Sequence, residues 1–388
     1  MGEAAVPFAS SADLAEKDET FEVLADGVYA LTAEGDPNVG AVEGEDFVVC
    51  FEARATPYMA SKWLERLREH TDKPVRFLVL SHYHAVRTLG ASAFGAENII
   101  AHEQTRRLIA ERGEADWASE AGRMPRLFTG AETIPGLTWP TVTFTDELTI
   151  ELGGTRGRLV LRHCGRGHTA GDIVAWLPEQ RILFAGDLVE TRAALYTGDA
   201  FHQHWAGPTL TAVEGLDAEV LVGGRGDVAH GRDAVGSAIG QTRNFLHVLM
   251  REVDEAATHG GGLKDAYEAA HRALEPRYGA WPIFEHCLPF NVSRYWDERT
   301  GVDWPRRSCW RAGACPPSCA RPPRGATRSD PARSAPSATS STSCTASAAE
   351  RSSPAKASPG RTGGPTTGTA SCSGSRSPPT TALVSRLS

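Results

Sequence analysis

Apolar residues recur in this chain in short runs that polar and charged residues separate. Runs that are rich in β-branched residues and bounded by glycine or acidic residues are typical of strands. This pattern predicts strands at residues 21–33, 39–51, 75–80, 98–101, 141–144, 148–152, 159–163, 173–177, 182–185 and 220–222.

Helices are predicted between these strands and after them. In the segment 57–71, Leu64 and Leu67 fall on one face of a helix, and Arg68 and Glu69 fall largely off it. Similar patterns predict further helices at 103–112, 115–123, 208–214, 234–258, 263–274 and 281–298. Two series of strands that alternate with helices predict an α/β fold in which two sheets pack face to face under helices, an αββα sandwich.

Three regions follow from these patterns. Residues 20–233 are predicted to form the αββα domain, and residues 234–304 a helical C-terminal extension. Residues 305–388 hold 12 of the 24 prolines and no Ile, Phe, Tyr or Met. Such a segment buries too little apolar surface to fold, so we expect a disordered tail. Its composition also resembles a GC-rich gene translated out of frame, and an artefactual tail and a genuine basic arm both stay open.

Charge changes at the same boundary. The net charge is −8, but the tail has 12 basic and 2 acidic residues, whereas residues 1–304 have 28 basic and 46 acidic ones. The resulting balance of −18 in the folded part disfavours nucleic acid as a partner, because a phosphate backbone would be repelled.

The chain shows no sign of export or of membrane insertion. Residues 1–22 lack the basic and apolar regions of a signal peptide. No apolar run approaches the roughly 18 residues of a membrane span. The cysteines of residues 1–304, which are Cys50, Cys164 and Cys287, are odd in number and have no disulfide-framework spacing. We therefore expect a cytoplasmic protein with no membrane partner.

Histidines and a carboxylate stand where predicted strands end. His82 and His84 follow one strand, and a spacing of one residue can turn both imidazoles toward one point. His168 lies in a glycine-rich segment after a later strand, and Asp187 follows another. Three imidazoles with an open position are the ligand set of a catalytic zinc site. We therefore predict that His82, His84 and His168 bind a metal, with Asp187 as a fourth ligand or as the residue that orients a water.

This arrangement resembles the metallo-β-lactamase fold superfamily of metallohydrolases over roughly residues 20–230. The family pattern has four parts: H-x-H-x-D-H, G-H-T-x-G-D/S, a strand ending in G-D, and a strand ending in G-H-G. In this chain they stand, in the same order, as His82-Tyr83-His84-Ala85-Val86-Arg87, Gly167-His168-Thr169-Ala170-Gly171-Asp172, Gly186-Asp187 and Gly224-Arg225-Gly226. The resemblance implies an αββα fold, with the three histidines on a first metal and Asp187 as the carboxylate that bridges two metals.

Three positions depart from the family pattern. Val86 replaces its aspartate, and Arg87 and Arg225 replace two of its histidines. Neither residue type binds zinc, so we expect one ion, zinc, with iron or manganese as further options. As catalytic residues, Arg87 and Arg225 would pair with Asp187 and hold an anionic group of a small-molecule substrate. The alternative is an internal salt bridge that fills the vacated metal position.

These residues together predict a metal-dependent hydrolase that acts on an ester, thioester, lactone or related bond. The metal would activate water and polarise the bond, and Asp187 would orient that water or take its proton. The alternative is a non-catalytic metal- or ligand-binding protein on the same fold. His204 and His230 are candidates for rebuilding a second metal site.

Overall fold

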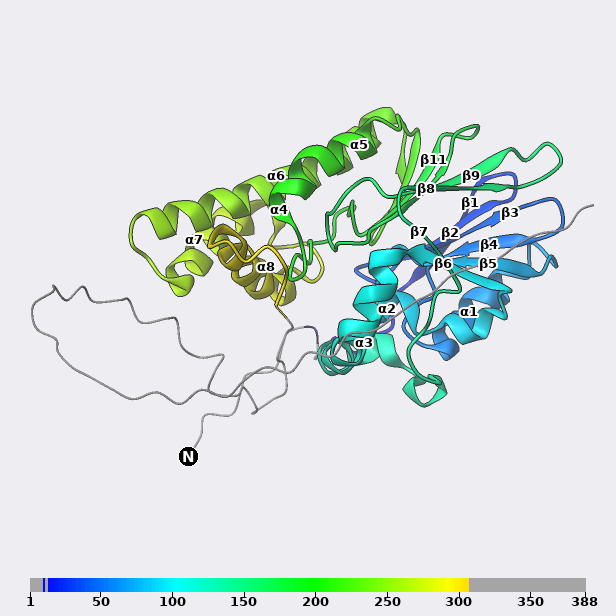
Figure 1. The fold of residues 1–388 in the computed structure, drawn as a ribbon, viewed down its shortest axis with the longest axis horizontal. Helices are drawn as coiled ribbons and strands as arrows, with labels where there is room; N and C mark the ends of the chain where they lie inside the picture. The colour runs from blue at the N-terminus through cyan, green and yellow to red at the C-terminus, as the bar shows by residue number, and fades with distance from the viewer. Residues whose placement is uncertain (1–9, 11–12, 307–388) are drawn as a thin grey trace, which may run out of the picture. The chain divides into compact units, whose positions relative to one another are not determined.

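A computed structural model of the chain describes residues 10 and 13–306 (Figure 1). Apart from residues 305 and 306, the predicted disordered tail lies outside the described residues. Within the described part, no helix combines the length and the apolar composition that crossing a membrane requires.

The strands form two mixed sheets (Figure 1). The seven strands of the first sheet lie in sequence order, antiparallel up to β4 and parallel from β4 onward. They are β1 (Glu19–Ala25), β2 (Val28–Ala33), β3 (Val39–Glu43), β4 (Val48–Phe51), β5 (Val75–Val79), β6 (Asn98–His102) and β7 (Val142–Phe144). The second sheet has the order β13-β12-β11-β10-β9-β8. Its strands are β8 (Glu147–Glu151), β9 (Arg158–Arg162), β10 (Val174–Leu177), β11 (Ile182–Gly186), β12 (Val220–Gly223) and β13 (Ala229–His230).

The two sheets bury one face of each against the other. Because successive side chains of a strand point to opposite faces, Ala30 of β2 lies in the core between the sheets and Leu31 lies on the outer face. On β11, Phe184 lies in the core between the sheets and Leu183 on the outer face. The inner core also includes Val28, Val42, Val49, Phe51, Val79, Ile100, Ile150, Leu159, Leu161, Ala175, Ile182 and Val222.

Helix α1 (Pro57–Leu67) covers the outer face of the first sheet. The helix begins with proline at its first position, and the Thr56 side chain caps it by accepting from the backbone N–H of Met59 at 3.1 Å. Trp63 is fully buried between this helix and the sheet.

A group of helices covers the outer face of the second sheet. They are α5 (Leu210–Glu214), α6 (Arg232–Thr258), α7 (Leu263–Tyr278) and α8 (Phe284–Arg299), and Figure 1 shows the last three together. Residues of α6 that recur every three or four positions are buried, which is the pattern of one apolar helix face: Val235, Ala238, Ile239, Thr242, Phe245, Leu246, Leu249 and Val253. The predicted αββα sandwich with a helical C-terminal region is confirmed.

Several predicted boundaries were wrong. Each of the segments 21–33 and 39–51 contains two strands, and Gly27, with φ of +71°, lies in the first turn. The predicted helices 103–112 and 115–123 are one helix, α3 (Glu103–Arg123), because Gly113 at its middle weakens a helix by only about 1 kcal/mol. The short elements α2 (Ala85–Thr88), α4 (His202–His204) and β13 were not predicted.

The two sheets approach each other closely at Gly40 of β3. A Cβ atom at this position would lie 2.2 Å from a ring carbon of Phe184. Overfilling a packed core costs about 1–3 kcal/mol, so Gly40→Ala should lower the free energy of unfolding by that amount in urea titrations.

The control for this variant is Gly236→Ala, at an exposed position inside α6 where the added Cβ meets nothing within 4 Å. Alanine stabilises a helix interior by up to about 1 kcal/mol relative to glycine, so this change should be neutral or stabilising. Equal unfolding free energies for the two variants would contradict the close approach of the sheets at Gly40.

Candidate metal centre

The loop that carries His82 and His84 is anchored at both ends. It follows β5, and α2 begins directly after His84. The first backbone N–H groups of a helix have no partner within the helix. Here Asp116 of α3 accepts from the N–H of Ala85 at 2.7 Å, and Glu120 from that of Val86 at 3.0 Å. These carboxylates fix the start of α2, and with it the position of the His84 backbone.

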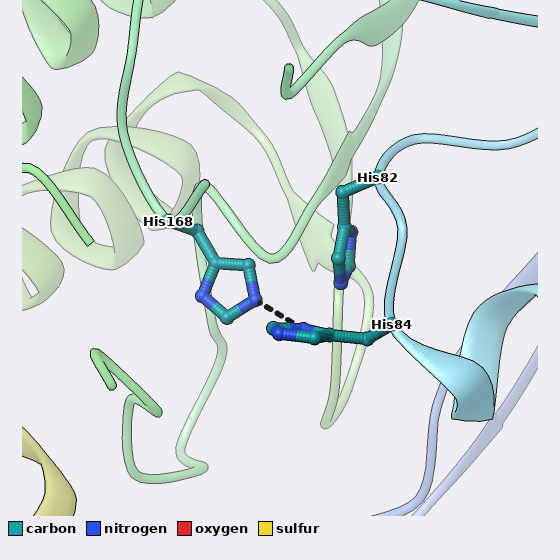
Figure 2. A group of neighbouring side chains, drawn as sticks. All are labelled: His82, His84 and His168. Carbon is teal, nitrogen blue, oxygen red and sulfur yellow. Dashed lines mark hydrogen bonds between the residues drawn. The ribbon is translucent and has the colours of Figure 1, made fainter. Parts of the chain in front are cut away.

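Three histidines meet at one point (Figure 2). His82 and His84 come from the loop after β5, and His168 comes from the loop between β9 and β10. Each is exposed by 2 % or less, and one nitrogen of each lies within 4.8 Å of those of the others. The His84 Nδ1 and His168 Nε2 atoms are 3.0 Å apart. Two nitrogens on one tetrahedral zinc lie roughly 3.4 Å apart, given Zn–N distances of about 2.0–2.1 Å, so the group fits a metal ion.

The second nitrogen of each imidazole has a partner on the outer side. This is the usual arrangement of metal-binding histidines, because the outer hydrogen bond sets the ring orientation and leaves the other nitrogen for the metal. The partners are the Ser81 hydroxyl for His82 Nδ1 at 2.7 Å, the Asp199 carboxylate for His84 Nε2 at 3.2 Å, and the Tyr196 carbonyl for His168 Nδ1 at 2.8 Å.

The inner nitrogens are then His82 Nε2, His84 Nδ1 and His168 Nε2. Among the described residues, His82 Nε2 has no hydrogen-bond partner although it is buried. The Nδ1 atom of His84 meets His168 Nε2 in the hydrogen bond drawn in Figure 2. A buried nitrogen without a partner beside two further imidazole nitrogens suits a cation that all three would bind.

Burial sets the charge of two of these histidines. It lowers the pKa of His168 to about 3 and that of His82 well below its ordinary value, so both are neutral, as metal ligands must be. Burial alone would also lower the pKa of His84, but Asp116 and Asp199 outweigh it and raise that pKa to about 9. Metal binding at His84 would therefore displace a proton.

Asp187 lies beside this group, directly after β11. Its Oδ2 atom is 3.8 Å from His82 Nε2 and 3.6 Å from His168 Nε2. Arg87 donates to Asp187 Oδ1, and Arg225 donates to Oδ2 at 3.0 Å. Burial alone would raise the pKa of Asp187, but the two guanidinium groups hold it well below its usual range. The structure therefore brings together all the residues predicted for the site.

Both arginines are buried and have further partners. Arg87 is 0 % exposed and also donates to the carbonyls of Asn38 at 3.1 Å and Gly224 at 2.7 Å. Arg225 is 4 % exposed and also donates to Glu190 at 3.2 Å. This geometry matches the internal salt bridge that was the alternative for these residues. A role of the arginines in binding a substrate anion stays a prediction.

The candidates for a rebuilt second metal site lie elsewhere. His204 is exposed and contacts Arg166, and His230 is exposed and pairs with Glu22. Val86, at the position of the family aspartate, is buried in an apolar cluster. In the part of the chain that the structure describes, the three histidines form the one group of metal-ligand type found.

The outer partners of the histidines were not predicted from the sequence. Ser81 precedes His82 directly, and this adjacency could have suggested it. Asp199 lies in a loop without any motif, 12 positions after Asp187. The partner at Tyr196 is a backbone carbonyl, which every residue type has. Neither of the last two carries a signal in the sequence.

Comparison with known proteins places the site in a family. Residues 33–225 match the family model described as "Metallo-beta-lactamase superfamily". A metallo-beta-lactamase type 2 from Bacteroides fragilis is 37 % identical over 97 residues, which cover 24 % of this chain and 38 % of that protein. The chain thus matches well under half the length of this curated relative.

Two solved structures of metallo-beta-lactamases are similar to part of the chain. A metallo-beta-lactamase from Pontibacter korlensis has a TM-score of 0.47 at 22 % identity, covering 59 % of this chain and 99 % of its own. The metallo-beta-lactamase FIM-1 from Pseudomonas aeruginosa, in its mono-zinc form, has a TM-score of 0.44 at 23 % identity. That match covers 58 % of this chain and 95 % of its own.

The buried ion pairs of Asp187 predict a large effect on stability. Arg225→Met would remove the guanidinium group that donates to Asp187 Oδ2 and to Glu190, and would leave both acceptor atoms buried without it. Removing one partner of a buried ion pair costs about 3–5 kcal/mol, and urea titration should show a loss in that range.

The control is Arg76→Met, which breaks the 3.1 Å ion pair with the exposed Asp46 and should change stability by about 0–1 kcal/mol. If Arg225→Met does not fold, Arg225→Lys keeps the charge and should recover part of the stability. Similar losses for Arg225→Met and Arg76→Met would contradict the buried pairing.

Proposed function

The chain belongs to the metallo-beta-lactamase superfamily, and we propose that it is a hydrolase that uses a single metal ion, zinc, held by His82, His84 and His168. The observation that carries this proposal is the orientation of the three imidazoles. Each has one nitrogen held from outside and the other turned to a common point. An arrangement that leaves a buried histidine nitrogen without a partner is costly unless a ligand binds there.

The proposal of one ion rests on the surroundings of Asp187. Both its carboxylate oxygens accept hydrogen bonds from guanidinium groups, those of Arg87 and Arg225. A second cation next to Asp187 would have to displace these buried positive charges. Val86, packed in an apolar cluster, offers no ligand atom. The positive charge that a second metal would bring is supplied by the arginines.

The substrate that we propose is a small molecule with an ester, thioester, lactone or related bond. A zinc ion on three imidazoles supplies a Lewis acid for the bond and makes water a stronger acid. Asp187, whose Oδ2 atom is 3.6 Å from His168 Nε2 and 3.8 Å from His82 Nε2, is placed to orient a water there. Because both of its oxygens already accept hydrogen bonds, orientation fits Asp187 better than proton removal.

Metal content tests the first half of this proposal. The purified full chain, loaded with zinc and desalted, should hold about one ion per chain, since residues 13–306 contain one such set of three imidazoles. His84→Ala should lose this ion, because it removes one of the three ligands. His204→Ala, at an exposed histidine outside the site, is the matched control and should keep it. Two ions per chain, or retention in His84→Ala, would contradict the proposal.

Turnover tests the second half. On a panel of small esters, thioesters and lactones, the zinc-loaded chain should hydrolyse at least one member, and chelation should abolish the reaction. His168→Ala should be inactive, and His204→Ala should match the unchanged chain. Full metal binding with no turnover on any member would favour a non-catalytic metal-binding protein. That alternative draws support from the near-complete burial of all three histidines.

A further inference from the structure

Helix α8 carries a buried polar face. Asn291, Arg294 and Glu298 are spaced three and four residues apart and therefore lie on one side of the helix. Asn291 is 0 % and Arg294 is 4 % exposed, and the side chain of Glu298 is 13 % exposed. Such residues are seldom buried unless they are paired, so this face must have a specific partner.

The partner is the segment 195–202, which follows β11 at a distance in the chain and ends on the first residue of α4. All three side chains bind this segment, mainly through its backbone. Asn291 accepts from the N–H of Thr197 at 2.7 Å and donates to the carbonyl of Leu195 at 2.8 Å. Arg294 donates to the carbonyl of Ala200 at 2.8 Å, and Glu298 accepts from the backbone and ring N–H of His202 at 3.0 and 2.8 Å. Because these hydrogen bonds hold its backbone at several points, the segment is fixed in one position.

This segment supplies two of the three outer partners of the metal site. The carbonyl of Tyr196 holds His168, and the carboxylate of Asp199 holds His84. Asp199 is itself held from α3, where Arg112 donates to its Oδ1 atom at 2.8 Å. The hydroxyl of Tyr83 donates to its Oδ2 atom at 2.9 Å.

We infer that Asp199 is a positioning residue for the metal site, and that α8 sets its place through the segment 195–202. The inference rests on the proposed metal binding and adds residues outside the family motifs. By accepting from Nε2–H of His84, the carboxylate fixes the ring orientation and the tautomer that leaves Nδ1 for the metal. Outer partners of this kind change metal affinity by about 10–100-fold when they are removed.

The test is zinc affinity, measured by competition with a chromophoric chelator on the full chain. Asp199→Asn keeps the side-chain shape but removes the charge, and we expect the dissociation constant to rise by about 10–100-fold. Replacing zinc with cobalt gives a second readout, because the visible spectrum reports ligand geometry. The spectrum of Asp199→Asn should differ from that of the unchanged chain.

The matched control is Glu111→Gln. Glu111 pairs with the same Arg112 at 2.8 Å, but it lies outside the hydrogen bonds of the histidines. Its affinity and cobalt spectrum should equal those of the unchanged chain. A second variant, Asn291→Asp, removes the donor to Leu195 at a distance from the metal. It should weaken binding by less than Asp199→Asn does.

The outcomes separate this inference from the proposed function. If the unchanged chain binds zinc and Asp199→Asn binds it equally well with the same spectrum, the role of Asp199 is wrong and the metal site stands. If the unchanged chain binds no zinc, the proposed function fails and the inference falls with it. If Asp199→Asn does not fold, Asn291→Asp decides: unchanged affinity and spectrum would overturn the role of α8 and its segment.

Discussion

A metal-binding imidazole must satisfy two conditions at once: one nitrogen is held, and the other is left for the ion. In this protein the first condition is met three times in different ways, by the Ser81 hydroxyl, the Asp199 carboxylate and the Tyr196 carbonyl. Because these rings are 98 % or more buried, water cannot replace a lost hydrogen-bond partner. The loops after β5, β9 and β11 therefore have to lie within hydrogen-bonding distance of one another. The packing of the two sheets brings these loops together.

The carboxylate of Asp187 imposes a second condition, because a buried charge must be balanced. Arg87 and Arg225 balance it in this protein, with Glu190 beside them. Burial raises the pKa of Glu190 to about 8, and repulsion from Asp187 adds to the shift, so the neutral acid predominates at pH 7. Two guanidinium groups then face one full carboxylate charge, and this excess of positive charge disfavours a second dication at the same place.

The sequence predicted the sandwich and the three histidines well, since both leave local signals. The short apolar runs of β2 and β11 predict strands that are buried on both faces, and His82, His84 and His168 each follow a strand within a short motif. Asp199 left no such signal, because what places it is Asn291, Arg294 and Glu298, which come more than ninety residues later in the chain. Helix boundaries near Gly113 failed for a similar reason: tertiary packing outweighed a weak local preference.

The site also joins the two sheets. His82 and His84 follow a strand of the first sheet and His168 follows a strand of the second, so an ion bound by all three would link them. A ligand that binds only the folded state stabilises it by about 4 kcal/mol at a thousand times its dissociation constant. Arg87 makes a similar link without any metal, because it follows β5 and donates to Asp187 after β11 and to Gly224 after β12. Arg87 can therefore keep the two sheets joined whether or not a metal is bound.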